Sequence, residues 1–427
     1  MRKSILACVA LTAALVLSLS AGAWADVAPT PGSQDIGQLA TSEQSASSTA
    51  TSTQTSPANQ AISVNILSPH AGTGSVTQTN SSAATSSAGN TNGTTQTAQQ
   101  AAGGTCCGGT QAIGQAAGSG QEATSSATST QTNPSNQAIS VNILSPQAGS
   151  GDVNQSNSSS ATSSAGNTNG TTQTAGQAGG GCCGGVQAIG QEADNHQVAG
   201  SQATSTQVNP SNQAISVSIL SPGAGSGDVT QSNSSSATSS AGNTNGTTQT
   251  AQQAAGGAPW VPCSTCEPSP CSTCHPASPT VQGIGQLAQN YQGAGSQATS
   301  TQTGASNVAG GFDLLGFKPH DDHPVLPVTR GGDVNQSNSS SATSSAGNTN
   351  GTTQTAAQWA GGCCGAVQAI GQAAFNAQHA TSAATSTQWC PSNLAFGPFG
   401  ELTQSNASAA MSAAGNTNGT SQFGTQA

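Results

Sequence analysis

The stretch from Val153 to Ala175 reads VNQSNSSSATSSAGNTNGTTQTA, and it decides the fold that we expect. Its amides and several alanines fall in one alternating phase: Gln155, Asn157, Ala161, Ala165, Asn167, Asn169 and Gln173. Alternate residues of an extended strand share one face. Stacked copies of such a strand would place amide over amide, as in cross-β interiors. The candidate ladder residues are therefore Gln155, Asn157, Asn167, Asn169 and Gln173.

This strand belongs to a unit that occurs five times. Each unit opens on Ile-Gly-Gln, at Ile36, Ile113, Ile189, Ile284 and Ile370. Each closes on Gly-Asn-Thr-Asn-Gly-Thr or a close variant, at Gly89, Gly166, Gly242, Gly347 and Gly415. A fixed period of about 76 residues indicates stacked supersecondary units. The expected units are 26–110, 111–186, 187–256, 282–366 and 367–427, with a Pro- and Cys-rich insert at 257–281.

The spacing of amides between Gln155 and Gln173 resembles the curlin repeat of secreted amyloid fibres, in which Gln and Asn recur on inward faces. The resemblance covers only the polar tracts, and this chain departs from curlin repeats in unit length, in an added aliphatic strand and in its cysteines. The resemblance implies a surface fibre used in adhesion and in a biofilm matrix.

A second, aliphatic strand precedes the polar tract of each regular unit. Ala138 to Leu144 alternates Ile139, Val141 and Ile143 with Ser140 and Asn142, which predicts a half-buried strand. Asn133-Pro134-Ser135-Asn136 before it is a turn signal, and Pro146 to Gly151 should form a loop. Units one and three repeat the strand at Ile62–Leu67 and Ile215–Leu220.

Units four and five are altered. In the fourth, the aliphatic strand is replaced by a divergent loop, 308–330. His320, Asp321, Asp322 and His323 in this loop have ligand-type side chains, but adjacent residues rarely converge on one ion, so we expect an exposed loop. In the fifth, Trp389-Cys390-Pro391 and Phe396–Phe399 replace the strand, and we expect this unit to cap the array.

The composition leaves two fold classes open. Gly, Thr and Asn disfavour helix throughout, and each unit has too few large apolar side chains to offset the conformational entropy of folding alone. We favour an all-β tandem-repeat β-solenoid or repetitive β-sheet with Gly-rich junctions. The alternative is a largely disordered low-complexity stalk.

The N-terminus predicts export. Arg2 and Lys3 precede the apolar run Ile5–Leu19, and Ala23-Trp24-Ala25 is a cleavage site, so residues 1–25 form a signal peptide. We expect no membrane span after cleavage. Only Lys318 and Arg330 then remain as basic residues, and a formal net charge of −10 argues against nucleic-acid binding.

The cysteines carry the distinctive chemistry. Three adjacent pairs lie in Gly-rich junctions, and they should oxidise outside the cell. Neighbouring Cα atoms are about 3.8 Å apart, whereas relaxed disulfides span about 4.4–6.8 Å, so bridges to another junction or another chain are expected. The odd total leaves one thiol unpaired within the chain, and Cys390 is the candidate, which could join two chains. The disulfide candidates are Cys106, Cys107, Cys182, Cys183, Cys263, Cys266, Cys271, Cys274, Cys363, Cys364 and Cys390.

Two CxxC motifs, Cys263–Cys266 and Cys271–Cys274, lie in the insert. About four residues separate them, against roughly 15 to 20 in common zinc sites, so we favour disulfides over metal. We expect no metal, no cofactor and no catalytic constellation. The hypothesis that the chain is an exported redox enzyme rests on these two motifs alone.

These features predict a secreted structural repeat protein of the cell surface, matrix or coat, whose partners are further copies of itself or cell-surface polymers. The alternative is an adhesive or ice-binding β-solenoid. Its binding face would carry Thr-x-Thr rows such as Thr128-Ser129-Thr130 and Thr204-Ser205-Thr206.

Overall fold

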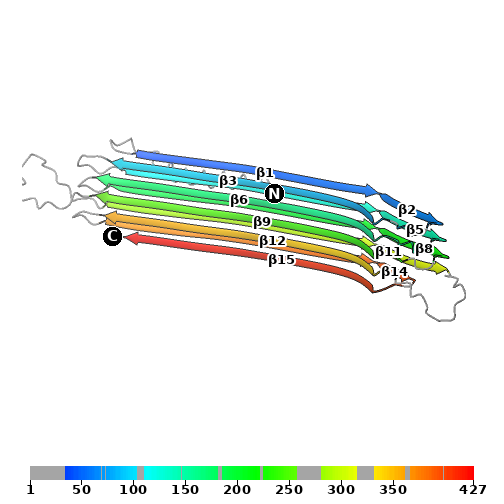
Figure 1. The fold of residues 1–427 in the computed structure, drawn as a ribbon. Coiled ribbons are helices and arrows are strands. Elements are labelled where there is room, and N and C mark those ends of the chain that lie inside the picture. The colour runs from blue at the N-terminus through cyan, green and yellow to red at the C-terminus, as the bar shows by residue number, and fades with distance from the viewer. Residues whose placement is uncertain are drawn as a thin grey trace, which may run out of the picture.

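The described part of the chain forms a parallel β-solenoid of five coils, each made of three strands (Figure 1). The computed structural model describes residues 34–102 except 69 and 73, 110–180 except 146, 185–256 except 222–224, 280–314, 331–360, and 366–427 except 398. Equivalent strands of successive coils pair in parallel and build three five-stranded sheets. The expectation of an all-β repeat fold is confirmed.

The first and third sheets consist of long strands. The first contains β1 (Gln34–Thr55), β4 (Thr110–Thr132), β7 (Val186–Val208), β10 (Thr280–Thr303) and β13 (Ala366–Trp389). The third contains β3 (Val76–Ala102), β6 (Val153–Gly180), β9 (Val229–Gly256), β12 (Val334–Ala360) and β15 (Leu402–Gln426). The short second sheet contains β2 (Ala58–Ile66), β5 (Ser135–Ile143), β8 (Ser211–Ile219), β11 (Ser306–Leu314) and β14 (Ser392–Phe396).

The pairing register follows the sequence repeat. Ile36 lies beside Ile113, which lies beside Ile189, and the same correspondence holds along each long strand. Because side chains alternate with period two, a slip by one residue would turn every inward side chain outward. Identity of the inward residues from coil to coil therefore specifies the register.

The first and third sheets face each other across a thin interior of small and amide side chains. Alanines from both sheets form columns, such as Ala84, Ala161 and Ala237 of the third sheet packed against Ala127 and Ala203 of the first. An isoleucine column through Ile113, Ile189 and Ile284 lies near one end of the long strands. The predicted inward phase of β6 is confirmed, since its seven predicted inward residues, from Gln155 to Gln173, are at most 3% exposed.

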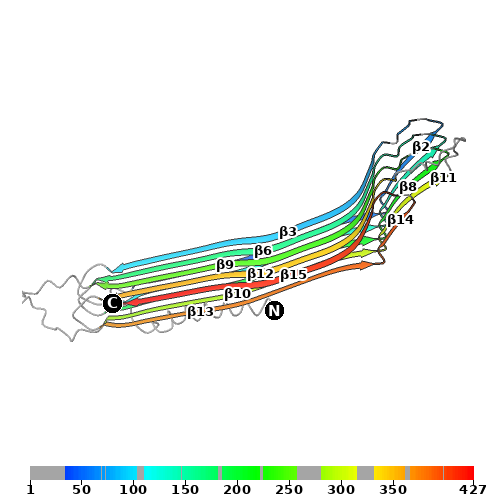
Figure 2. The same cartoon turned by 60° about the horizontal axis from the view of Figure 1, so that its bottom comes forward.

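A sharp bend joins the first and second strands of each coil. Asn133 has a positive φ of 51° and is followed by Pro134, and the residues at the same place in the other coils, Ser56, Asn209, Gly304 and Cys390, also have positive φ. The predicted turn at Asn133-Pro134 is therefore a bend, and the chain does not reverse there. The short strands rise out of the line of the long ones (Figure 2).

The short strands turn inward the face that carries their polar residues. Asn136, Ala138 and Asn142 are buried, whereas Ile139 and the other aliphatic residues of β5 are half-buried. The inner face meets polar groups of the third sheet: Asn136 donates to the Ser156 carbonyl at 3.0 Å and to Asn157 Oδ1 at 3.1 Å. Hydrogen bonding across the interior therefore decides which face turns inward.

Units four and five keep the second strand, so the prediction that they lose it is wrong. Ser306 of β11 pairs with Ser211, and Ser392 of β14 pairs with Ser306. The backbone ladder and the inward asparagines Asn307 and Asn393 suffice without the Ile-Val-Ile alternation of the first three coils. The fifth coil is the last coil of the stack, where a cap is expected. However, every residue of its strand β15 is exposed.

Replacing one central ladder amide should destabilise the stack. Asn233 donates to Asn307 Oδ1 and Asn338 Oδ1, both at 3.0 Å, and accepts from Asn157. Asn233→Ala removes these three buried hydrogen bonds, at about 0.5–1.5 kcal/mol each. We expect a lower denaturant midpoint. The outward substitution Ser240→Ala is the control, and an equal loss in both variants would contradict the importance of the ladder.

Candidate functional surfaces

Amide ladders run through all five coils. Seven are built of glutamine, beginning at Gln34, Gln38, Gln44, Gln54, Gln78, Gln96 and Gln100 of the first coil. Four are built of asparagine, beginning at Asn59, Asn80, Asn90 and Asn92. In each, one amide nitrogen donates to the amide oxygen of the equivalent residue in the neighbouring coil.

The predicted ladder residues of β6 all lie in these columns. Gln155 Nε2 donates to Gln78 Oε1 at 2.8 Å, and Gln231 donates to Gln155 Oε1 at 2.8 Å. The second N–H of Gln155 reaches across the interior to the Gln213 carbonyl at 3.0 Å. The ladders therefore join coils to one another and also join the sheets of one coil. Asn157, Asn167, Asn169 and Gln173 are bonded to the next coil in the same way.

The ladders have a direction. Each inward glutamine donates toward the first coil, as in the series Gln378 to Gln292 to Gln197. Each of the four long asparagine ladders donates toward the fifth coil, as Asn90 does to Asn167. The first coil therefore ends in glutamine donors and asparagine acceptors, and the fifth coil ends in glutamine acceptors and asparagine donors.

Both ends of the stack are open in the described part of the chain. The strands β1, β2 and β3 lie at one end and β13, β14 and β15 at the other, and each pairs on one side only. All eleven ladders that begin in the first coil end in the fifth on the same residue type. Each end thus presents long, flat edge strands, which are templates for pairing with another chain.

The outer faces of the two long sheets differ in uniformity. Seven successive outward positions of the third sheet, from Thr85 to Thr97, are identical in the first four coils. On the first sheet, outward positions from Leu39 to Thr49 vary: the Glu43 column continues with Gly120, His196, Tyr291 and Ala377. Inward stacking does not constrain either outer face, so the uniformity of the third sheet requires another explanation.

The predicted Thr-x-Thr rows do lie on an outer face, that of the first sheet near the bend. The Thr51 and Thr53 columns contain threonine in all five coils, including Thr128 and Thr130 of the second. Threonine hydroxyls and methyl groups there form a regular two-column array.

Charge is also divided between the faces. None of the five strands of the third sheet contains a charged residue. The first sheet carries Glu192, Asp194 and His196 on its outer face, where the His196 ring stacks on Tyr291 with centroids 4.8 Å apart. Burial raises the pKa of both carboxyls, and the Asp194 charge raises the pKa of Glu192 further. Burial lowers the pKa of His196 against the opposing effect of Asp194.

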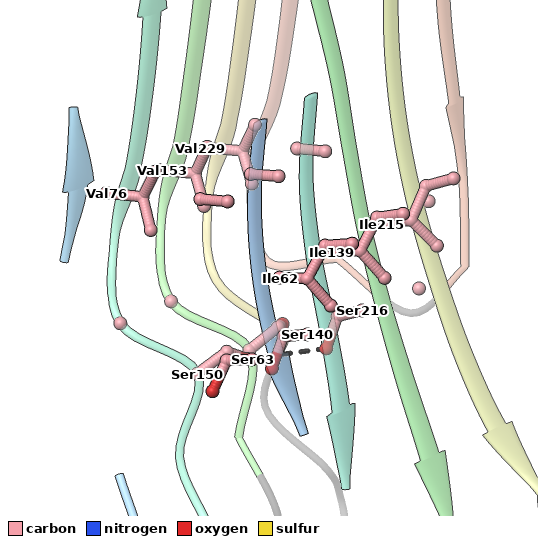
Figure 3. Close-up of a pocket in the computed structure, with 18 of the residues that line it drawn as sticks. Ile62, Ser63, Val76, Ile139, Ser140, Ser150, Val153, Ile215, Ser216 and Val229 are labelled. Atoms are coloured by element: carbon pink, nitrogen blue, oxygen red, sulfur yellow. Dashed lines mark hydrogen bonds between the residues drawn. The ribbon is translucent and has the colours of Figure 1, made fainter. Parts of the chain in front are cut away.

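A narrow cavity of about 160 Å³ runs across several coils between the short strands and the start of the third sheet. Rows of equivalent residues line it, among them Val76, Val153 and Val229 facing Ser63, Ser140 and Ser216 (Figure 3). Phe399 also lines it. Ligand sites are usually about 300–1,000 Å³, so this cavity fits at most a small apolar molecule or water.

Ten of the eleven disulfide candidates lie outside the described residues, as do both CxxC motifs, the His320–His323 segment and the signal peptide. Cys390 is described, and it is an exposed free thiol at the bend of the fifth coil. Among the described residues, no group of three or more His, Cys, Asp or Glu side chains is placed to hold a metal ion.

The described segments include no helix with the length and apolar character needed to cross a membrane. Comparisons with protein families, with curated proteins and with solved structures find no match to this chain.

Neutralising Asp194 should stabilise the protein at neutral pH. The raised folded-state pKa means that the ionised carboxylate opposes folding above that pKa, and the penalty disappears once both states are protonated, below about 3.8. We expect Asp194→Asn to raise the melting temperature at pH 7 and to leave it unchanged near pH 3. The exposed residue Glu43 supplies the control Glu43→Gln, and equal rises at both pH values would contradict the assignment.

Proposed function

We propose that this chain is a secreted structural protein of the cell surface, matrix or coat, which polymerises head to tail into a continuous β-solenoid filament. The observation that carries the proposal is the match between its two ends. Eleven ladders end on the same amides at both ends, with donors at one end where the other has acceptors.

The polarity of the ladders sets the geometry of the joint. When the fifth coil of one copy lies on the first coil of the next, Gln378 Oε1 accepts from Gln44 and Gln422 Oε1 accepts from Gln96. Two first coils facing each other would oppose donor to donor. The contact is therefore heterologous, and a heterologous contact that does not close into a ring grows as an open filament.

Edge strands at the two ends have the length and sequence that such a joint needs. β15 is 25 residues long, uncharged and exposed throughout. Proteins that remain monomeric usually block such edges with charges, bulges, prolines or a covering segment. The predicted signal peptide and the paired junction cysteines fit a fibre that is exported and then locked by disulfides, and Cys390 lies in the terminal coil, where it can join two chains.

A second candidate is favoured by the five-coil threonine array at Thr51 and Thr53. A flat, regular set of hydroxyl and methyl groups suits an adhesive or ice-binding face. Thermal hysteresis that is abolished by Thr128→Lys with Thr204→Lys, and retained in Ser164→Lys on the opposite sheet, would support this candidate. Its absence in the parent protein at high concentration excludes ice binding.

Charge placed inside the terminal rung should stop polymerisation. Gln378→Lys with Gln422→Lys keeps a donor for Gln292 and Gln354 of the fourth coil, but lysine has no acceptor for the next copy. Under reducing conditions we expect the parent protein to form filaments visible by electron microscopy, whereas the double variant stays as short particles.

The matched control is Thr381→Lys, which adds a charge to the outward face of the same strand, β13. We expect it to polymerise like the parent protein. Filaments from the double lysine variant, or a parent protein that never sediments as a polymer, would overturn the proposal.

A further inference from the structure

The outer face of the third sheet carries an alternation of glycine and threonine in every coil. In the second coil the outward residues are Gly166, Thr168, Gly170 and Thr172, and coils one, three and four repeat this order in register. The fifth coil keeps Gly415, Thr417 and Gly419, followed by Ser421, although neighbouring outward positions there have changed to Met411, Ala413 and Phe423. The alternation is therefore retained where its surroundings are not.

The fold does not account for one of the two glycine columns. A β-carbon on Gly93, Gly170, Gly246 or Gly351 would meet no atom within 4 Å. Glycine in a strand costs about 0.5–1 kcal/mol relative to a residue with a side chain, and it often marks a place where another backbone approaches closely. Four aligned glycines in open space therefore leave room for an external contact, as do the glycines of the Gly37 column on the first sheet.

The neighbouring glycine column is partly explained by the fold. A β-carbon on Gly89, Gly166, Gly242 or Gly347 would lie 3.3–3.5 Å from the carbonyl oxygen of the next glycine in the column. Together the two columns form troughs on either side of the Thr168 column, and a shallow groove follows the Gly166 column across four coils.

We propose that this Gly-Thr face binds the same face of a second copy of the chain, with a two-fold axis parallel to the solenoid axis. Reversal of the order Gly-Thr-Gly-Thr sets each threonine opposite a glycine. With the axis between the columns, Thr168 faces Gly170 of the second copy, and Gly166 faces Thr172 of the second copy. Each threonine column of one copy then lies in a glycine trough of the other. Both copies contribute the same contacts, as a two-fold interface requires.

Charge favours this face over the others. The chain carries a formal net charge of −10, yet no charged residue lies on any strand of the third sheet. Two copies can therefore approach through this sheet without like-charge repulsion at the contact. The acidic residues of the first sheet would remain on the outer surfaces of the pair.

The available area is sufficient for a stable dimer. Five strands about 4.8 Å apart, each some 25 residues long at about 3.3 Å per residue, cover roughly 2,000 Å². A standard protein interface buries about 800 Å² per partner. The face also lies beside the strand edges rather than on them, so pairing through it is independent of head-to-tail growth and would join two filaments side by side.

The test uses the full mature chain with Gln378→Lys and Gln422→Lys, under reducing conditions, so that neither end growth nor disulfides contribute. We expect a dimer by sedimentation equilibrium. Adding Gly170→Val and Gly246→Val fills the troughs and should weaken dimerisation at least tenfold. The fold should persist, because valine suits a strand and the β-carbon has room.

The matched control is Gly283→Val with Gly293→Val on the outer face of the first sheet, where a β-carbon also has open space and the neighbouring coils carry residues other than glycine. We expect this control to dimerise like its parent. If the trough variant fails to fold, Thr168→Glu with Thr244→Glu tests the same face by like-charge repulsion and should also give monomers.

A monomeric parent, or equal weakening by the trough and control variants, would overturn the proposal. These outcomes are separate from the filament experiment, because a protein that never polymerises can still dimerise through this face, and a filament can grow without lateral pairing.

Discussion

The buried amide ladder is the interaction on which the rest of this structure depends. A carboxamide both donates and accepts, so identical residues stacked about 4.8 Å apart satisfy one another along the whole column. Leaving one amide group unpaired in the interior costs about 1–3 kcal/mol. Asn142 illustrates the constraint: it accepts from Asn65, but the next coil has Ser218 at that place, and the Asn142 Nδ2 group has no partner among the described residues.

This requirement explains why the units are so alike and why the chain needs so little apolar surface. Each coil must present the same amides in the same register, and each is stabilised mainly by the coils beside it. Alanine columns and one isoleucine column fill the space between the ladders of the two facing sheets. A ladder of this kind has no natural end, so in the filament that we propose, stability and polymerisation would arise from the same contacts.

The alternation of amides in β6 was sufficient to predict strands, their inward face and the five ladder residues, because period two is a direct signature of an extended chain. The aliphatic alternation in β5 predicted the strand but not which of its faces turns inward, since the inner face meets the polar start of the third sheet and Asn136 is bonded there. The strands β11 and β14 were missed for a related reason: their backbone pairing and one inward asparagine hold them in the stack although their other side chains have changed. The direction of the ladders depends on amide orientation, which no sequence pattern encodes.

The same logic separates the two faces of every strand into positions that the fold constrains and positions that it leaves free. Inward residues repeat because the ladders demand it, so their identity says nothing about a role of the outer faces. Outward residues of the first sheet have diverged widely between Leu39 and Thr49, which shows that the repeats have had the opportunity to change. Against that internal control, the retained Gly-Thr alternation of the third sheet supports the lateral contact that we propose, and an uncharged surface whose reversed pattern fits itself favours another copy as the partner.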